Sequence, residues 1–232
     1  NVAYHPYYTR EGGVPTLEMQ VLVPIQEHNE FAFNIVKAGE RLAKDSQYIA
    51  MSKEAYNRAP DYYVITRAIA NFERTLISGN SPFDKYIYQN QSGALNATEK
   101  AGMGLFYSEK TNCSNCHSGF NFSNYAFENN GLYESYNDEG RMRLTNNSED
   151  EALFKVPTLR NVALTGPYMH DGSMRSLQEV VDHYNNGGKN HPNKSNLVQP
   201  LNLTNQEKDQ LIAFLKSLTD QQFITEEKFK DR

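Results

Sequence analysis

The sequence is short of several residue types, and each shortage excludes a class of protein. Its 232 residues include no tryptophan and only two cysteines, so a framework of several disulfides is excluded. No apolar run approaches the roughly 20 residues that a membrane-spanning helix needs. Lys and Arg number 23 against 28 Asp and Glu, and no basic patch stands out. We therefore expect no nucleic-acid partner.

Both cysteines stand in one motif, Cys113-Ser114-Asn115-Cys116-His117. A C-x-x-C-H motif is typical of covalent haem c attachment. Thiols one helical turn apart can both form thioethers with the haem vinyl groups, and the imidazole that follows can bind the iron as its proximal ligand. The motif therefore predicts one covalently bound haem c at Cys113, Cys116 and His117.

Other uses of the two thiols are weaker explanations. A local disulfide is one. Half of a zinc site is another, but zinc usually takes a second Cys/His pair, and the chain has no third cysteine. A redox-active C-x-x-C usually lies in a βαβ context, which is missing here. Covalent haem implies export, so we expect a periplasmic protein in which Asn1 is an internal or processed start.

Helical periodicity and capping signals predict an all-α chain, because no pair of strands is convincing. Capping boxes are expected at Asn96/Glu99, Ser176/Glu179 and Thr204/Glu207. The expected helices cover residues 16–21, residues 31–57 with Gly39 as a weak point, the stretch from Pro60-Asp61 to a stop at Gly79, residues 97–108, the stretch from Ser176 to before Gly187, and residues 205–219. The Asn-, Ser-, Glu- and Gly-rich composition of residues 118–152 predicts a long irregular insertion.

The distal side of the haem iron offers several candidate ligands. A thioether ligand stabilises reduced iron, whereas a phenolate favours oxidised iron. Spacing alone favours Met169, which stands in a turn at residues 167–172. The other candidates downstream of the motif are Met142, Met174, His170, His183, His191 and Tyr184.

Three longer runs resemble one family. Residues 156–172, VPTLRNVALTGPYMHDG, resemble the C-terminal haem domain of bacterial dihaem cytochrome c peroxidases and MauG-type enzymes. Residues 70–84, ANFERTLISGNSPFD, resemble the inter-domain signature of that family, and residues 12–18, GGVPTLE, resemble another of its motifs. The resemblance covers nearly the whole chain, and its motifs agree in order.

The resemblance implies an oxidoreductase that uses hydrogen peroxide, with the haem at residues 113–117 as its electron-transfer haem. Residues 96–232 would form the C-terminal cytochrome c-like haem domain. The Ser-, Asn-, Gly- and Pro-rich segment 79–97 marks the boundary. Residues 1–95 would then be the helical remainder of a second cytochrome c-like domain, the peroxidatic one, without its own C-x-x-C-H.

The resemblance also changes the predicted distal ligand. The family places this ligand on the helix after the His170-Asp171-Gly172 turn, as Met in peroxidases and as Tyr in MauG-type members. Tyr184 occupies that position here, and Met169 stays the alternative. A plain core or surface aromatic is the other explanation of Tyr184.

At the second, peroxidatic haem the family implies three residues, Gln20, Pro24 and Glu30. A carboxylate there can move a proton between peroxide oxygens, and an amide can position the peroxide. The alternative for Glu30 is a solvated residue that starts a helix.

The family further implies a calcium ion between the haems, held partly by backbone oxygens, here those of Thr165 and Pro167, with Asn1 as a weaker side-chain candidate. Its partners would be hydrogen peroxide and either an electron-donor protein, such as a small cytochrome or cupredoxin, or a protein substrate. Whether the protein forms a homodimer stays an open question at this point.

Two departures from the family matter. The aromatic between the haems is usually Trp, and the matching position here is Arg10. The second C-x-x-C-H is absent, which we interpret as truncation rather than a separate polypeptide. Taken literally, one motif also fits a single-haem c-type cytochrome that acts only in electron transfer.

Overall fold

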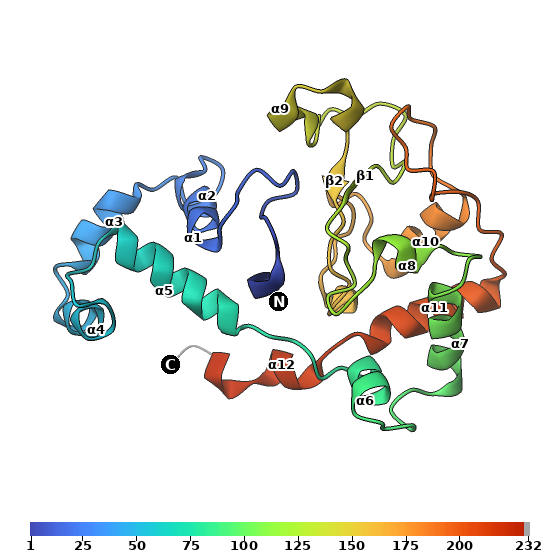
Figure 1. Cartoon of the computed structure of the whole chain (residues 1–232), viewed down its shortest axis with the longest axis horizontal. Helices are drawn as coiled ribbons and strands as arrows, with labels where there is room; N and C mark the ends of the chain where they lie inside the picture. The colour runs from blue at the N-terminus through green and yellow to red at the C-terminus, as the bar shows by residue number, and fades with distance from the viewer. Residues whose placement is uncertain (230–232) are drawn as a thin grey trace. The chain divides into compact units, whose positions relative to one another are not determined.

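The computed structural model describes residues 1–229, and helices dominate them (Figure 1). This confirms the predicted all-α class. One short antiparallel ladder, β1 (Phe127–Glu128) with β2 (Phe154–Lys155), was not predicted. The chain divides into two compact units, Asn1–Ile77 and the part from Ser78 onward. Among the described residues, no helix has the length and apolar character to cross a membrane.

The first unit packs its short helices around a small core. Buried Leu17, Val21 and Ala70 form this core together with Tyr8. The elements are η1 (Val2–Tyr4), α1 (Leu17–Gln20), α2 (Leu22–Gln26), α3 (Ile35–Leu42), α4 (Ser46–Tyr56) and α5 (Tyr62–Thr75).

The single helix predicted over residues 31–57 is wrong, because two helices occupy this stretch. The carboxylate of Asp45 accepts a hydrogen bond from the Gln47 backbone N–H, which starts α4 as a separate helix. Gly39 is not the weak point, since it lies inside α3. A Cβ added there would lie 2.9 Å from the Cα atom of Asp61, so the glycine allows α3 to approach the start of α5.

Helix α5 begins as predicted, with the Asp61 carboxylate accepting from the Val64 backbone N–H. It ends at Thr75, before the predicted stop at Gly79. Its apolar face is only partly covered within residues 1–229, because Phe72 is 51% exposed.

The second unit has an aromatic core. Phe83, Phe106, Phe122 and Phe214 are buried and contact one another edge to face or tilted. Its helices are α6 (Pro82–Tyr88), α7 (Ala97–Phe106), α8 (Cys113–Cys116), α9 (Met142–Thr145), α10 (Leu177–Asn185), α11 (Asn205–Ser217) and α12 (Gln221–Thr225), with 3-10 turns η2 (Ser148–Asp150), η3 (Val162–Leu164) and η4 (Glu227–Phe229).

All three predicted capping boxes are present at the starts of α7, α10 and α11. A fourth, between Ser81 and Asp84, begins α6 inside the segment predicted as the domain boundary. Phe83 of α6 belongs to the second core, and the compact units divide between Ile77 and Ser78. The domain boundary predicted between residues 95 and 96 stays a prediction.

Helices α7 and α11 cross at very close range. A Cβ added at Gly102 of α7 would lie 1.8 Å from the Gln210 carbonyl oxygen of α11. Only glycine fits at this contact, which brings buried Phe106 against Phe214 with ring centroids 5.0 Å apart. The crossing supports the scaffold on which the C-x-x-C-H motif is placed.

Candidate functional site: a haem c attachment site

The C-x-x-C-H residues form a single helical turn. Helix α8 runs over Cys113–Cys116, and the His117 backbone N–H closes it on the Cys113 carbonyl at 2.9 Å. Residues three apart share one face of a helix, so both side chains leave α8 in similar directions. Both are free thiols. Burial raises the pKa of both, that of Cys116 to about 11, so both are neutral at pH 7.

The imidazole of His117 is oriented for metal binding. Its Nδ1 lies 2.9 Å from the carbonyl oxygen of Phe122, which can only accept. Nδ1 therefore carries the proton, and the lone pair of Nε2 is left for a metal. Burial lowers the pKa of His117, while the carbonyls of Phe122 and Pro157 work against this shift. The ring is thus neutral, which is the form that binds iron.

Both predicted distal ligands lie beside one amide. The Asn130 Nδ2 lies 3.5 Å from the Tyr184 hydroxyl oxygen and 3.2 Å from the Met169 sulfur. Burial raises the pKa of Tyr184 to about 12, and the thiols of Cys113 and Cys116 contribute in the same direction. Tyr184 and Cys113 pack against the same buried core. The choice between Tyr184 and Met169 as iron ligand stays a prediction.

The histidines considered as distal candidates each have another contact. His170 stacks on Phe154 with ring centroids 4.2 Å apart. His183 has its Nε2 3.0 Å from the Asn130 carbonyl oxygen. The Nδ1 of His191 lies 3.1 Å from the Asn193 backbone nitrogen, whose N–H it accepts.

The residues present fit haem c. Two neutral thiols stand on one helical turn, followed by an imidazole whose Nε2 is open. Cys113 packs against the same apolar core as Leu159 and Met103. Over residues 1–229 no three His, Cys, Asp or Glu side chains gather to hold a metal ion.

The residues predicted at a second haem follow one another along the first unit. Gln20 ends α1, and Pro24 lies in α2. Glu30 is exposed in the turn after α2, where its backbone N–H donates to the Glu27 carbonyl at 3.1 Å. Since α3 begins only at Ile35, Glu30 does not start a helix, so that part of the alternative explanation is wrong, whereas its side chain is solvated as that explanation expects. Roles at a second haem stay predictions.

The predicted calcium residues belong to both units. Thr165 follows η3, and its hydroxyl donates to the Val162 carbonyl at 3.3 Å. Pro167 follows in a cis peptide with Gly166. Asn1 lies in the first unit, before η1. Calcium binding at these residues stays a prediction.

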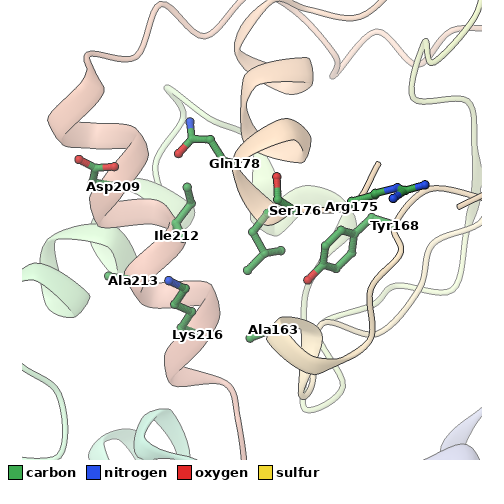
Figure 2. A pocket seen from close by; sticks show the side chains of 10 residues that line it. Ala163, Tyr168, Arg175, Ser176, Gln178, Asp209, Ile212, Ala213 and Lys216 are labelled. Atoms are coloured by element: carbon green, nitrogen blue, oxygen red, sulfur yellow. The ribbon is translucent and has the colours of Figure 1, made fainter. Parts of the chain in front are cut away.

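A cavity of about 560 Å³ opens in the second unit (Figure 2). Figure 2 shows it between α11, the start of α10 and the turn that carries Tyr168. Residues predicted to bind haem or calcium are not part of its lining, which is Ala163, Tyr168, Arg175, Ser176, Leu177, Gln178, Asp209, Ile212, Ala213 and Lys216.

Two groups in the site were not predicted from the sequence. Asn130 lies in the segment interpreted as an irregular insertion, where its type is common and carries no signal. The Phe122 carbonyl belongs to the backbone, so no residue pattern marks it. Both act through contacts that only the folded chain makes.

Comparison with known proteins identifies the family. Residues 1–92 match the family model for di-haem cytochrome c peroxidase, and residues 100–219 match the model for cytochrome c. The chain is 30% identical to a solved MauG-like protein associated with microbial copper homeostasis, with a TM-score of 0.90, covering 100% of this chain and 77% of that one. The chain therefore belongs to the dihaem cytochrome c peroxidase and MauG family.

Curated relatives agree with this assignment. The chain is 34% identical to the methylamine utilization protein MauG of Methylorubrum extorquens over 222 residues, 94% of this chain and 62% of the relative. It is 33% identical to the cytochrome c551 peroxidase of Nitrosomonas europaea over 218 residues, 91% of this chain and 61% of that one. The chain thus spans about three-fifths of the length of these relatives.

Proposed function

We propose that this chain is the haem-binding part of a dihaem peroxidase or MauG-type oxidoreductase that uses hydrogen peroxide. Haem c at Cys113, Cys116 and His117 would serve as its electron-transfer haem. The observation that carries the proposal is the single helical turn with both thiols, followed by His117, whose Nδ1 is held by a carbonyl. Tyr184 and Cys113 pack against the same core. Family membership favours this function over a single-haem electron carrier.

The residues of the site have separate roles in this proposal. Bound haem supplies an iron that takes up and releases single electrons. The two cysteines would hold it covalently, and His117 would bind it through Nε2. Tyr184 is the proposed distal ligand, and its phenolate oxygen would favour the oxidised iron. The Asn130 amide would donate to that oxygen.

Peroxide chemistry belongs to a second haem in this proposal. There the Glu30 carboxylate would take a proton from one peroxide oxygen and return it to the other, while the Gln20 amide orients the peroxide and Pro24 borders it. Reduction to two waters needs two electrons and two protons. An electron-donor protein, such as a small cytochrome or cupredoxin, or a protein substrate would supply the electrons.

Three further features complete the proposal. Calcium would bind the backbone oxygens of Thr165 and Pro167, which suit a hard cation, with Asn1 as the side-chain ligand. The protein would work in the periplasm, since haem c attachment implies export. A homodimer is its proposed assembly.

The test is to purify the full gene product and to measure its haem-to-protein ratio and its peroxide turnover with a reduced donor. We expect two haems per chain and turnover. One haem per chain without turnover would overturn the peroxidase and leave the electron carrier.

A further inference from the structure

A buried ion pair lies behind the C-x-x-C-H motif. Asp84 and Arg160 are 1% and 4% exposed. Two guanidinium nitrogens of Arg160 donate to the two carboxylate oxygens of Asp84 at 2.9 and 3.0 Å, a bidentate arrangement. Ser81 donates to Asp84 as well, from its hydroxyl at 2.7 Å and its backbone N–H at 2.9 Å. The Arg160 side chain is therefore fixed in direction.

Arg160 contacts the loop that follows the motif through its third guanidinium nitrogen. Its Nε donates to the Phe120 carbonyl at 2.6 Å, and its guanidinium carbon lies 3.9 Å from the centre of the Phe120 ring. The Thr158 hydroxyl donates to the next carbonyl, that of Asn121, at 2.6 Å. Two consecutive carbonyls of the loop are thus held by side chains from residues 158–160.

The third carbonyl of the loop holds the proximal imidazole. It is that of Phe122, 2.9 Å from His117 Nδ1. Phe122 has a φ of 52°, a conformation that side-chain-bearing residues rarely adopt and that the surrounding contacts must maintain. This carbonyl therefore follows directly on the two that Arg160 and Thr158 hold.

We infer that Arg160, fixed by Asp84, and Thr158 are positioning residues for His117. They hold the loop carbonyls so that the hydrogen bond from Nδ1 stays short. A strong Nδ1–H···O bond increases the electron donation of an imidazole to its metal, which favours the oxidised iron. The side chains thereby keep the reduction potential of this haem low. The inference rests on the proposed haem attachment.

The test uses the haem-loaded full gene product and four variants. Arg160→Lys keeps a cation beside Asp84 but lacks the planar Nε donor for Phe120. Thr158→Val removes the hydroxyl at nearly constant volume, and Thr158→Ser restores it. Asp220→Asn is the matched control, because Asp220 is also 2% exposed and its carboxylate accepts from Ser78, Gly79, Asn80 and Phe223 rather than from the loop.

The readouts are the midpoint potential of the His117 haem by redox titration and its g-values by electron paramagnetic resonance. We expect positive potential shifts and altered g-values in Arg160→Lys and Thr158→Val. Thr158→Ser and Asp220→Asn should keep the wild-type potential, although Asp220→Asn loses stability.

A merely structural role would lower the stability of Arg160→Lys and Thr158→Val without moving the potential, and that result would overturn the inference. If Arg160→Lys fails to fold, the comparison of Thr158→Val with Thr158→Ser decides by the same readout. Wild-type protein without haem on its cysteines would instead overturn the proposed function.

Discussion

The crossing of α7 and α11 allows a prediction of stability with opposite signs at two neighbouring glycines. At Gly102 an added Cβ would lie 1.8 Å from the Gln210 carbonyl oxygen and 2.9 Å from the Phe214 Cβ. Ordinary contacts between heavy atoms begin at about 3.5 Å, so the helices would have to separate by roughly 1.5 Å. At Gly104, exposed on the same helix, an added Cβ meets no atom within 4 Å.

The magnitudes follow from these contacts. Replacing glycine by alanine inside a helix gains about 1 kcal/mol of helix propensity, and Gly104→Ala should show a gain of this order. At Gly102 overpacking costs about 1–3 kcal/mol and loosens the packing between Phe106 and Phe214 as well. We therefore expect Gly102→Ala to lose about 2 kcal/mol or more of unfolding free energy.

Guanidinium unfolding followed by circular dichroism and by haem absorbance measures both variants in the haem-loaded protein. The wild type and Gly104→Ala, on the same helix, are the references. A Gly102→Ala protein as stable as Gly104→Ala would refute the reasoning, because it would mean that the two helices do not cross at this distance.

Two further predictions concern the site. Tyr184→Phe should keep covalent haem but raise the haem potential and change its absorption spectrum, because the phenolate is lost; Met169→Leu is the control, and a spectrum that changes only in Met169→Leu would reverse the assignment. Asp84→Asn should lose about 3–5 kcal/mol of stability, because Arg160 stays buried without its counter-charge. Burial raises the pKa of Asp84, but the hydrogen bonds from Arg160 and Ser81 outweigh it and lower the pKa below its usual value. The stability that the ionised Asp84 carboxylate contributes is therefore fully present above its unfolded-state pKa of about 3.9. It is lost as the pH falls through the lower pKa of the folded state. Acid titration of unfolding should show a weaker pH dependence in Asp84→Asn, whereas an equal dependence would show that Asp84 is not ionised in the fold.

Local signals predicted the helix starts well. In a capping box both partners lie three residues apart, so the sequence contains the whole interaction at Asn96, Ser176 and Thr204. The same signal at Ser81 and Asp84 lies within a Ser-, Asn- and Gly-rich composition that indicates a domain boundary rather than a helix start.

Contacts between distant segments were harder to predict. Gly39 looked like a helix break, whereas it permits the approach of α3 to Asp61. The strand pair joins Phe127 with Lys155, and neither strand is longer than two residues, which is too short for a period-2 pattern. In each case the deciding partner lies far along the chain.

In the candidate site, too, local residues were predicted and residues brought together by distant contacts were not. The two thiols and His117 are a local motif and were predicted from their spacing. Tyr184 came from resemblance, because spacing alone favoured Met169. The supporting shell of Phe122, Asn130 and Arg160 arises only when the loop after α8 meets residues 156–160 and α10.

The most direct test of the account is to count and locate haem in the full gene product. Pyridine haemochrome analysis gives the number of haems per chain, and mass spectrometry of proteolytic peptides gives their attachment sites. The account predicts two haems per chain, one of them joined to both Cys113 and Cys116. A peptide with these cysteines free or joined in a disulfide would contradict it.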